Sequence, residues 1–208
     1  MLKDWSNVII PEEEEINERL EKARNKLVQQ QILIMQKKLP VLVSFDGWGA
    51  AGKGSILGKI IKNIDPRFFK VAVMDKPTED EKRRPFLYRY VINIPEAGKF
   101  TFMDGGCLDE VTKQKLSGKI TDEEYKRKIE SVKRFERQLS DNGYLVIKFF
   151  FHIGEQEQRK RLTRLLDDKN TRWRVSEYDL WQNQHYKKSL KAFDQFIDDT
   201  SQSIAPWY

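Results

Sequence analysis

The feature that most constrains this chain is a short apolar run followed at once by a glycine-rich stretch and a lysine. Residues 41–45 read Val-Leu-Val-Ser-Phe, a run that is typical of a buried strand. Residues 47–55 read Gly-Trp-Gly-Ala-Ala-Gly-Lys-Gly-Ser and contain the spacing G-x-x-x-x-G-K. Because this spacing follows a predicted strand and opens a predicted helix at 53–64, it predicts a phosphate-binding loop.

Such a loop binds phosphate mainly through its backbone. Glycines let the chain curl so that several N–H groups face one anion, and the start of the next helix adds partial positive charge. Lys53 adds a mobile cation for the terminal phosphates. Gly54 stands where a serine or threonine usually follows the lysine, and Ser55 comes one residue later. The candidate phosphate-binding residues of the loop are Gly47, Gly49, Ala50, Ala51, Gly52, Lys53, Gly54 and Ser55.

Strand-like and helix-like segments alternate along the rest of the chain. We expect further strands at 71–74, 99–103 and 145–151, and helices at 12–38, 78–92, 121–142, 155–166 and 176–196. This alternation predicts βαβ units, and therefore an α/β fold with a mostly parallel sheet and helices on both faces.

Composition narrows the class of protein without giving a function. The chain has 208 residues, a net charge of +6 and 39% hydrophobic residues, which suits a globular protein. Its single cysteine excludes an internal disulfide and, with two histidines, argues against structural zinc. No apolar run approaches the roughly 20 residues of a membrane span, and residues 1–11 lack a secretory signal. We therefore expect a cytoplasmic protein without a membrane partner. The scattered basic residues argue against nucleic acid as a partner.

An acid and two arginines outside the loop are candidates for phosphoryl-transfer chemistry. Asp104 closes the strand at 99–103, where an acid would hold Mg²⁺ directly or through water. Arg172 and Arg174 flank Trp173 in a polar loop, where mobile arginines neutralise phosphate charge. The competing interpretations are a simple turn at Asp104 and a solvated helix face for the basic residues.

Several segments taken together resemble the polyphosphate kinase 2 family. They are residues 45–54, 76–79, 84–90, 94–95, 102–104, 151–153, 157–161, 172–175 and 205–208. The resemblance implies a three-layer α/β/α sandwich of the P-loop kinase type, related to thymidylate kinases. It also implies Mg²⁺-dependent transfer of phosphate between inorganic polyphosphate and a nucleotide, with AMP to ADP favoured and ADP to ATP possible.

The motifs and the resemblance together give candidate roles for individual residues. The candidate catalytic residues are Lys53, Asp104, Arg89 and Asp46, of which Asp104 and Asp46 are also the candidate metal ligands. Lys76 and Arg84 join the phosphate-binding set, and Arg172, Trp173 and Arg174 form a lid. We expect one domain over residues 1–208, with an N-terminal helical segment at 1–39 and a basic helix and lid at about 155–185. A homo-oligomer or a tandem partner domain is expected as well.

Two positions depart from the family pattern and keep alternatives open. Gly49 stands where the family's loop usually has aspartate, and Gly105 stands where its second motif usually has arginine. Asp46 or Asp109 could serve as a surrogate acid. The alternatives to a phosphotransferase are a degenerate domain that binds polyphosphate or nucleotide and supports a catalytic partner, and an ATP-dependent nucleotide kinase. Relatives continue into another strand beyond residue 208, so we expect a domain of a longer protein.

Overall fold

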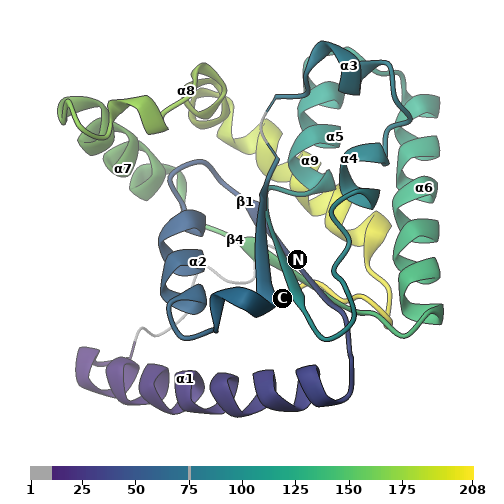
Figure 1. Ribbon diagram of the computed structural model, residues 1–208. Helices are drawn as coiled ribbons and strands as arrows, with labels where there is room; N and C mark the ends of the chain where they lie inside the picture. The colour runs from purple at the N-terminus through teal and green to yellow at the C-terminus, as the bar shows by residue number, and fades with distance from the viewer. Residues whose placement is uncertain (1–10, 75) are drawn as a thin grey trace.

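The computed structural model describes residues 11–74 and 76–208, so the first ten residues of the expected N-terminal segment lie outside it. Its sheet consists of β1 (Val41–Gly47), β2 (Phe69–Val73), β3 (Phe100–Asp104) and β4 (Leu145–Phe151). The strand order is β2-β3-β1-β4 and every pairing is parallel (Figure 1). The carboxyl ends of β1 and β3 therefore lie side by side, at the edge where parallel sheets present their ligand-binding loops.

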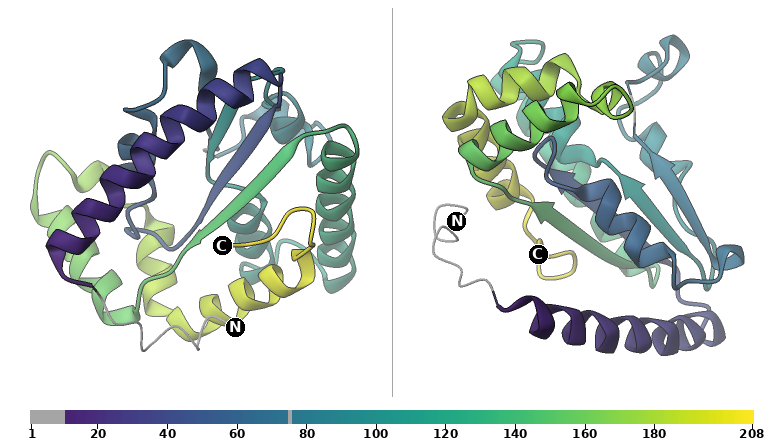
Figure 2. Two further views of the ribbon diagram at one scale, coloured as in Figure 1. Left: turned by 90° about the horizontal axis from the view of Figure 1, so that it is seen from below. Right: turned by 90° about the vertical axis from the view of Figure 1, so that its left-hand side faces the viewer.

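Helices cover both faces of the sheet, which confirms the expected α/β/α layers (Figure 2). One face packs against α1 (Glu13–Gln36) and α2 (Lys53–Ile61), and the other against α4 (Tyr88–Val91), α5 (Cys107–Leu116), α6 (Asp122–Asp141) and α9 (Tyr186–Thr200). The alternation along β1 sets these contacts, because Val43 and Phe45 face α2 while Leu42 faces α6.

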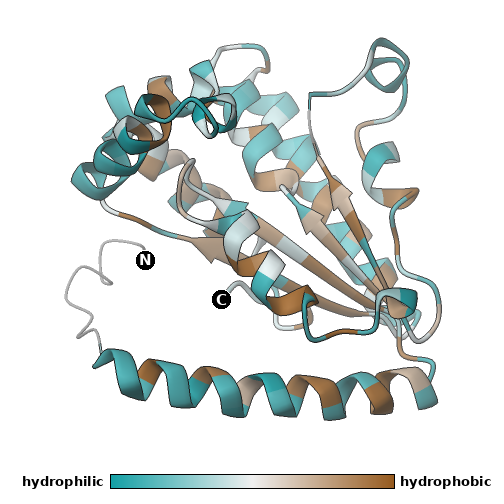
Figure 3. Cartoon of the chain, turned by 60° about the vertical axis from the view of Figure 1, so that its left-hand side comes forward, coloured by the Kyte–Doolittle hydropathy of each residue, from teal (hydrophilic) through white to brown (hydrophobic). Residues whose placement is uncertain are grey.

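The remaining elements lie above the carboxyl edge or link the layers. They are α3 (Glu79–Lys82), α7 (Glu155–Asp167), α8 (Glu177–Gln184) and the 3₁₀ turns η2 (Pro66–Phe68) and η3 (Arg172–Arg174). Apolar residues gather on the sheet and on the inner faces of its helices (Figure 3). No helix in the described ranges is long and apolar enough to cross a membrane.

Two expectations about the helices were wrong, and one helix was missed. The single helix at 78–92 is two short helices, α3 and α4, because Pro85 lacks an N–H and restricts the residue before it. The helix at 176–196 is divided at His185, whose φ of −113° and ψ of 36° are not helical. The helix α5 was not expected at all, although it carries part of the site.

Candidate functional site

The glycine-rich segment between β1 and α2 has the shape that a phosphate-binding loop requires. Gly47 and Gly52 have φ values of 131° and 96°, and Ala50 has a φ of 59°. Gly47 also lacks room for a side chain, because a Cβ there would lie 2.4 Å from the carbonyl oxygen of Phe151. Trp48 is fully buried and stacks on Tyr186 with their ring centroids 4.1 Å apart. The loop is therefore anchored in the core at its start and enters α2 at its end.

Lys53 lies at the first position of α2 and turns its side chain back over the loop. Its Nζ donates hydrogen bonds to the carbonyl oxygens of Gly47 and Trp48, each over 3.0 Å. The ammonium group is thus held above the curled backbone, which places a positive charge at the start of α2 where anions bind.

Asp46 is buried directly before the loop, with 1% of its surface exposed. Its Oδ2 accepts a hydrogen bond from Ser44 over 2.6 Å, and its Oδ1 accepts one from the backbone N–H of Gly106 over 3.0 Å. Burial raises the pKa of the Asp46 carboxyl to about 6, with the neighbouring Asp109 adding to the rise. In this arrangement Asp46 braces β1 against α5, and its role as a metal ligand stays a prediction.

Asp104 and Asp109 bring carboxylates close to the loop from β3 and α5. The Asp104 Oδ2 lies 3.9 Å from the position of a Cβ built on Gly54, so this carboxylate stands beside the first turn of α2. Burial raises the pKa of Asp109, and the positive charges of Lys53 and Lys113 oppose that rise. Asp109 thus lies within electrostatic reach of the loop lysine.

These acids do not form a metal cage by themselves. Within 11–74 and 76–208, no three His, Cys, Asp or Glu side chains are grouped to hold a metal ion. Mg²⁺ is usually bound through one or two carboxylates and the phosphates of a substrate, rather than by an all-protein cage. The carboxylates of Asp104 and Asp109 beside a phosphate loop therefore fit a magnesium ion that arrives with phosphate.

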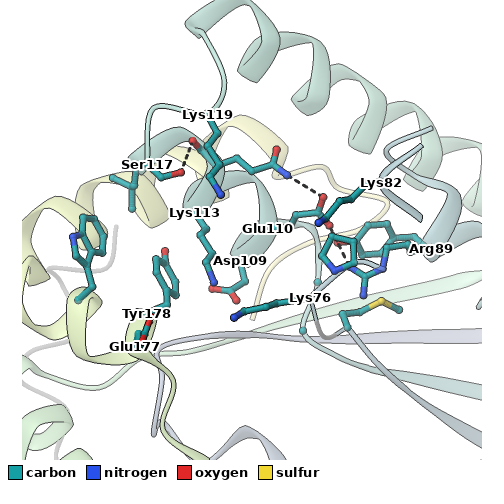
Figure 4. A pocket seen from close by; sticks show the side chains of 18 residues that line it. Lys76, Lys82, Arg89, Asp109, Glu110, Lys113, Ser117, Lys119, Glu177 and Tyr178 are labelled. Carbon is teal, nitrogen blue, oxygen red and sulfur yellow. Dashed lines mark hydrogen bonds and ion pairs between the residues drawn. The ribbon is translucent and has the colours of Figure 1, made fainter. Parts of the chain in front are cut away.

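A cavity of about 950 Å³ opens between the segment after β2, α5 and α8 (Figure 4). We call it the cationic cavity, because its lining includes Lys76, Lys82, Arg89, Lys113 and Lys119, which outnumber the two glutamates there, Glu110 and Glu177. Asp109 also lines it, and Figure 4 shows Lys76 and Lys113 directed toward that acid. Two aromatic rings on α8, Tyr178 and Trp181, also line the cavity, stacked with centroids 5.8 Å apart and planes 11° apart. The cavity thus combines positive charge with a flat aromatic surface.

The structure places some of the predicted residues at this cavity and others away from it. Lys76 lines it, as does Arg89, whose guanidinium lies 3.5 Å from Glu81 and 3.8 Å from Glu110. Arg84 is exposed instead and pairs with Asp80. The predicted lid residues of η3 are also exposed and are not among the cavity's lining residues.

The sequence did not predict most of the residues that line the cavity, nor the hydrogen bonds from α7 and α8 to the loop. Lys113, Tyr178 and Trp181 come together only in the folded chain. Gln182 of α8 accepts a hydrogen bond from the N–H of Gly49 over 3.0 Å, and Gln158 of α7 donates to the Gly49 carbonyl over 3.3 Å. Because Gln158 also donates to Gln182 over 2.9 Å, the two helices and the loop share one polar network. The sequence signal was weak, since isolated glutamines carry no motif.

A parallel α/β sheet whose inner strand β1 runs into a glycine-rich loop and a helix defines the fold class of the P-loop proteins. Over residues 11–208 the chain matches the family model described as polyphosphate kinase 2, and it therefore belongs to the polyphosphate kinase 2 family. The likeness noted in the sequence is confirmed.

Curated relatives carry matching names. The chain is 28% identical over 168 residues to an ADP-polyphosphate phosphotransferase 3 of Rhizobium meliloti, covering 81% of this chain and 59% of that protein. It is 31% identical over 171 residues to a polyphosphate:AMP phosphotransferase of Pseudomonas syringae, covering 82% of this chain and 34% of that protein. The chain thus spans between a third and three fifths of the length of these two relatives.

Solved structures agree with the fold. The polyphosphate kinase 2 of Arthrobacter aurescens superimposes with a TM-score of 0.85 at 26% identity, covering 91% of this chain and 69% of that one. A putative polyphosphate kinase 2 of Pseudomonas aeruginosa gives a TM-score of 0.92 at 26% identity, covering all of this chain and 45% of that one.

Proposed function

We propose that this chain transfers a phosphoryl group between inorganic polyphosphate and a nucleotide, with AMP to ADP as the favoured reaction and ADP to ATP as a second one. The observation that carries the proposal is the position of Asp109. This residue lines the cationic cavity and also lies close enough to Lys53 for the lysine to favour its charged form. In our proposal Asp109 therefore links the phosphate loop to the cavity, so that the two act as one site.

The residues of this site suit a reaction that depends on position and charge rather than on covalent chemistry. Phosphoryl transfer needs the reacting oxygens held in line and the developing charge neutralised. The loop N–H groups, the start of α2 and Lys53 would hold the phosphate that is transferred. The cationic cavity would hold the rest of a polyanionic chain, and the stacked pair of Tyr178 and Trp181 offers a surface for a nucleobase.

A divalent cation, which we take to be Mg²⁺, would supply charge neutralisation at the phosphates. Asp104, beside the first turn of α2, and Asp109 are the residues that would hold it. Asp46 accepts hydrogen bonds from Ser44 and Gly106, so its carboxylate joins β1 to α5 in this arrangement.

The printed names of the relatives support both nucleotide acceptors. One relative is an AMP/ADP-polyphosphate phosphotransferase of Meiothermus ruber, 29% identical over 193 residues. In our proposal α7, η3 and α8 form the lid of the site, and a second copy or a tandem partner completes the whole protein. A cytoplasmic location fits these substrates.

The test is a coupled assay with polyphosphate, Mg²⁺ and either AMP or ADP. We expect transfer to AMP, and we expect Lys53→Ala to lower the rate about 100-fold or more. The matched control is Lys59→Ala, an exposed lysine on the same helix, which should keep the rate. Absence of transfer to both acceptors would overturn the proposal, and a preference for ATP over polyphosphate as donor would favour an ATP-dependent kinase.

The second candidate is a domain that binds polyphosphate or nucleotide without turnover. It is favoured by Gly49 and Gly105, which stand where the family pattern has an aspartate and an arginine. Polyphosphate binding that depends on Lys53, together with no transfer, would support this second function.

A further inference from the structure

Position 49 requires glycine because there is no space for a side chain, and not because of its backbone φ. Its φ lies outside the left-handed region that marks Gly47 and Gly52, so other residues could adopt its conformation. A Cβ built on Gly49, however, would lie 2.2 Å from Oδ1 and 2.7 Å from Cγ of Asp179. The carboxyl group of Asp179 therefore occupies the volume that a side chain at position 49 would need.

Asp179 is held in that place by its own helix. Its Oδ2 accepts hydrogen bonds from the backbone N–H of Ser176 over 2.8 Å and from the Ser176 hydroxyl over 2.7 Å. With Oδ2 fixed by this cap, Oδ1 is the oxygen that faces the loop. One turn further along α8, Gln182 accepts the N–H of Gly49, so α8 meets the loop along one side.

The charges around Asp179 are those of the proposed site. The negative charge of Asp179 raises the pKa of Asp109, while Lys53 and Lys113 lower it. Asp109 thus interacts electrostatically with Asp179 and with both lysines.

We propose that Asp179 supplies, from α8, the carboxylate that stands over the phosphate loop in the space left by Gly49. The inference rests on the proposed function, in which phosphates occupy the loop. There the carboxylate of Asp179 would join Asp109 in holding the divalent cation that arrives with the phosphates, since carboxylate oxygens are the ligands Mg²⁺ prefers. The carboxylate that acts at the loop is then supplied by α8 and not by the loop itself.

A double-mutant cycle tests whether a carboxylate at position 49 can replace the one at position 179. Gly49→Asp alone places two carboxylates in one space, and Asp179→Gly alone removes the acid. Each single change should lower the transfer rate about 100-fold, whereas the combination should recover to within about tenfold of the parent. A double variant no better than either single variant would overturn the proposal, as would an Asp179→Gly variant with the parental rate.

The isosteric variant Asp179→Asn separates this role from helix capping. It keeps an oxygen for Ser176 and removes the charge, so we expect it to lose activity as Asp179→Gly does. Its matched control is Glu124→Gln, because Glu124 fills the same capping-box position on α6, where it accepts from the N–H of Thr121 over 2.8 Å. Glu124→Gln should behave as the parent. An Asp179→Asn variant with parental activity would show that Asp179 only caps α8.

A binding measurement keeps the inference distinct from the proposed function. Calorimetric titration of polyphosphate at increasing Mg²⁺ should show that Asp179→Asn needs about tenfold more Mg²⁺ than the parent. If the parent binds polyphosphate but transfers nothing, the proposed function fails and this titration still decides the role of Asp179. An unchanged Mg²⁺ requirement in Asp179→Asn would overturn that role even in an active enzyme.

Discussion

Gly106 donates its backbone N–H to Oδ1 of Asp46 over 3.0 Å, so one buried carboxylate ties the end of β1 to the start of α5. The two residues fit so closely that a Cβ on Gly106 would lie 2.2 Å from the other carboxylate oxygen of Asp46. The strand before the phosphate loop and the helix that carries Asp109 are therefore joined through Asp46.

This burial predicts a pH dependence of stability. The pKa of Asp46 is raised from 3.8 to about 6, so the folded protein holds the proton more tightly than the unfolded chain does. The stability associated with the protonated carboxyl is complete below pH 3.8 and is lost as the pH rises to about 6, with an upper limit of about 3 kcal/mol. In Asp46→Asn this loss should be absent, so the variant should gain stability relative to the parent across that window.

Urea unfolding at a series of pH values measures the difference. The exposed Asp141 provides the control, because Asp141→Asn should follow the parent at every pH. Parallel profiles for Asp46→Asn and the parent would contradict the prediction.

Lys113 should contribute to phosphate binding rather than to stability. It lines the cationic cavity, and its Nζ lies 4.2 Å from the centroid of the Tyr178 ring. We expect Lys113→Ala to raise the KM for polyphosphate about tenfold, with a smaller effect at high salt because ions screen the attraction. Lys115, two residues on, pairs with Asp122 instead, so Lys115→Ala should leave the KM unchanged. Equal effects of the two changes would show that general charge, and not the cavity, attracts polyphosphate.

Trp181 should affect the nucleotide more than the polyphosphate. Its ring forms an aromatic wall of the cationic cavity with Tyr178, where a base could stack. Trp181→Ala should raise the KM for AMP about tenfold and leave the KM for polyphosphate near its parental value. Tyr208→Ala removes an aromatic ring that is 69% exposed outside the cavity and serves as the control. A rise in the KM for polyphosphate alone would show that the nucleobase of AMP does not stack on Trp181.

The buried pair of Glu136 and Lys148 should govern stability. The Lys148 ammonium donates to both carboxylate oxygens of Glu136 over 2.8 and 2.9 Å and to the carbonyl of Thr200 over 3.1 Å. Glu136→Leu leaves that ammonium buried without its carboxylate, so the free energy of unfolding should fall by about 3 to 5 kcal/mol. Adding Lys148→Met should recover most of the loss in the same denaturant titration. A double variant as unstable as the single one would show that packing, rather than the uncompensated charge, causes the loss.

The strands and the phosphate loop were predictable because their signals are local. The run at 41–45 and the glycine spacing after it need no distant contact to be read. Helix α5 was missed because its residues follow two glycines and carry few apolar side chains, so packing against α9 rather than periodicity stabilises it. Asp179 belongs to the capping box of α8, but its close approach to Gly49 joins two segments that lie far apart in the sequence. Such contacts leave no trace in spacing.

The burial of Trp48 makes the phosphate loop part of the hydrophobic core. The indole ring of Trp48 stacks on Tyr186 and makes an edge contact with Phe193, so a side chain of the loop packs against α9. Ligand binding to the loop is therefore coupled to the free energy of unfolding. A ligand that binds only the native loop therefore stabilises the whole fold, and the unfolding temperature should rise with the logarithm of the ligand concentration relative to its Kd.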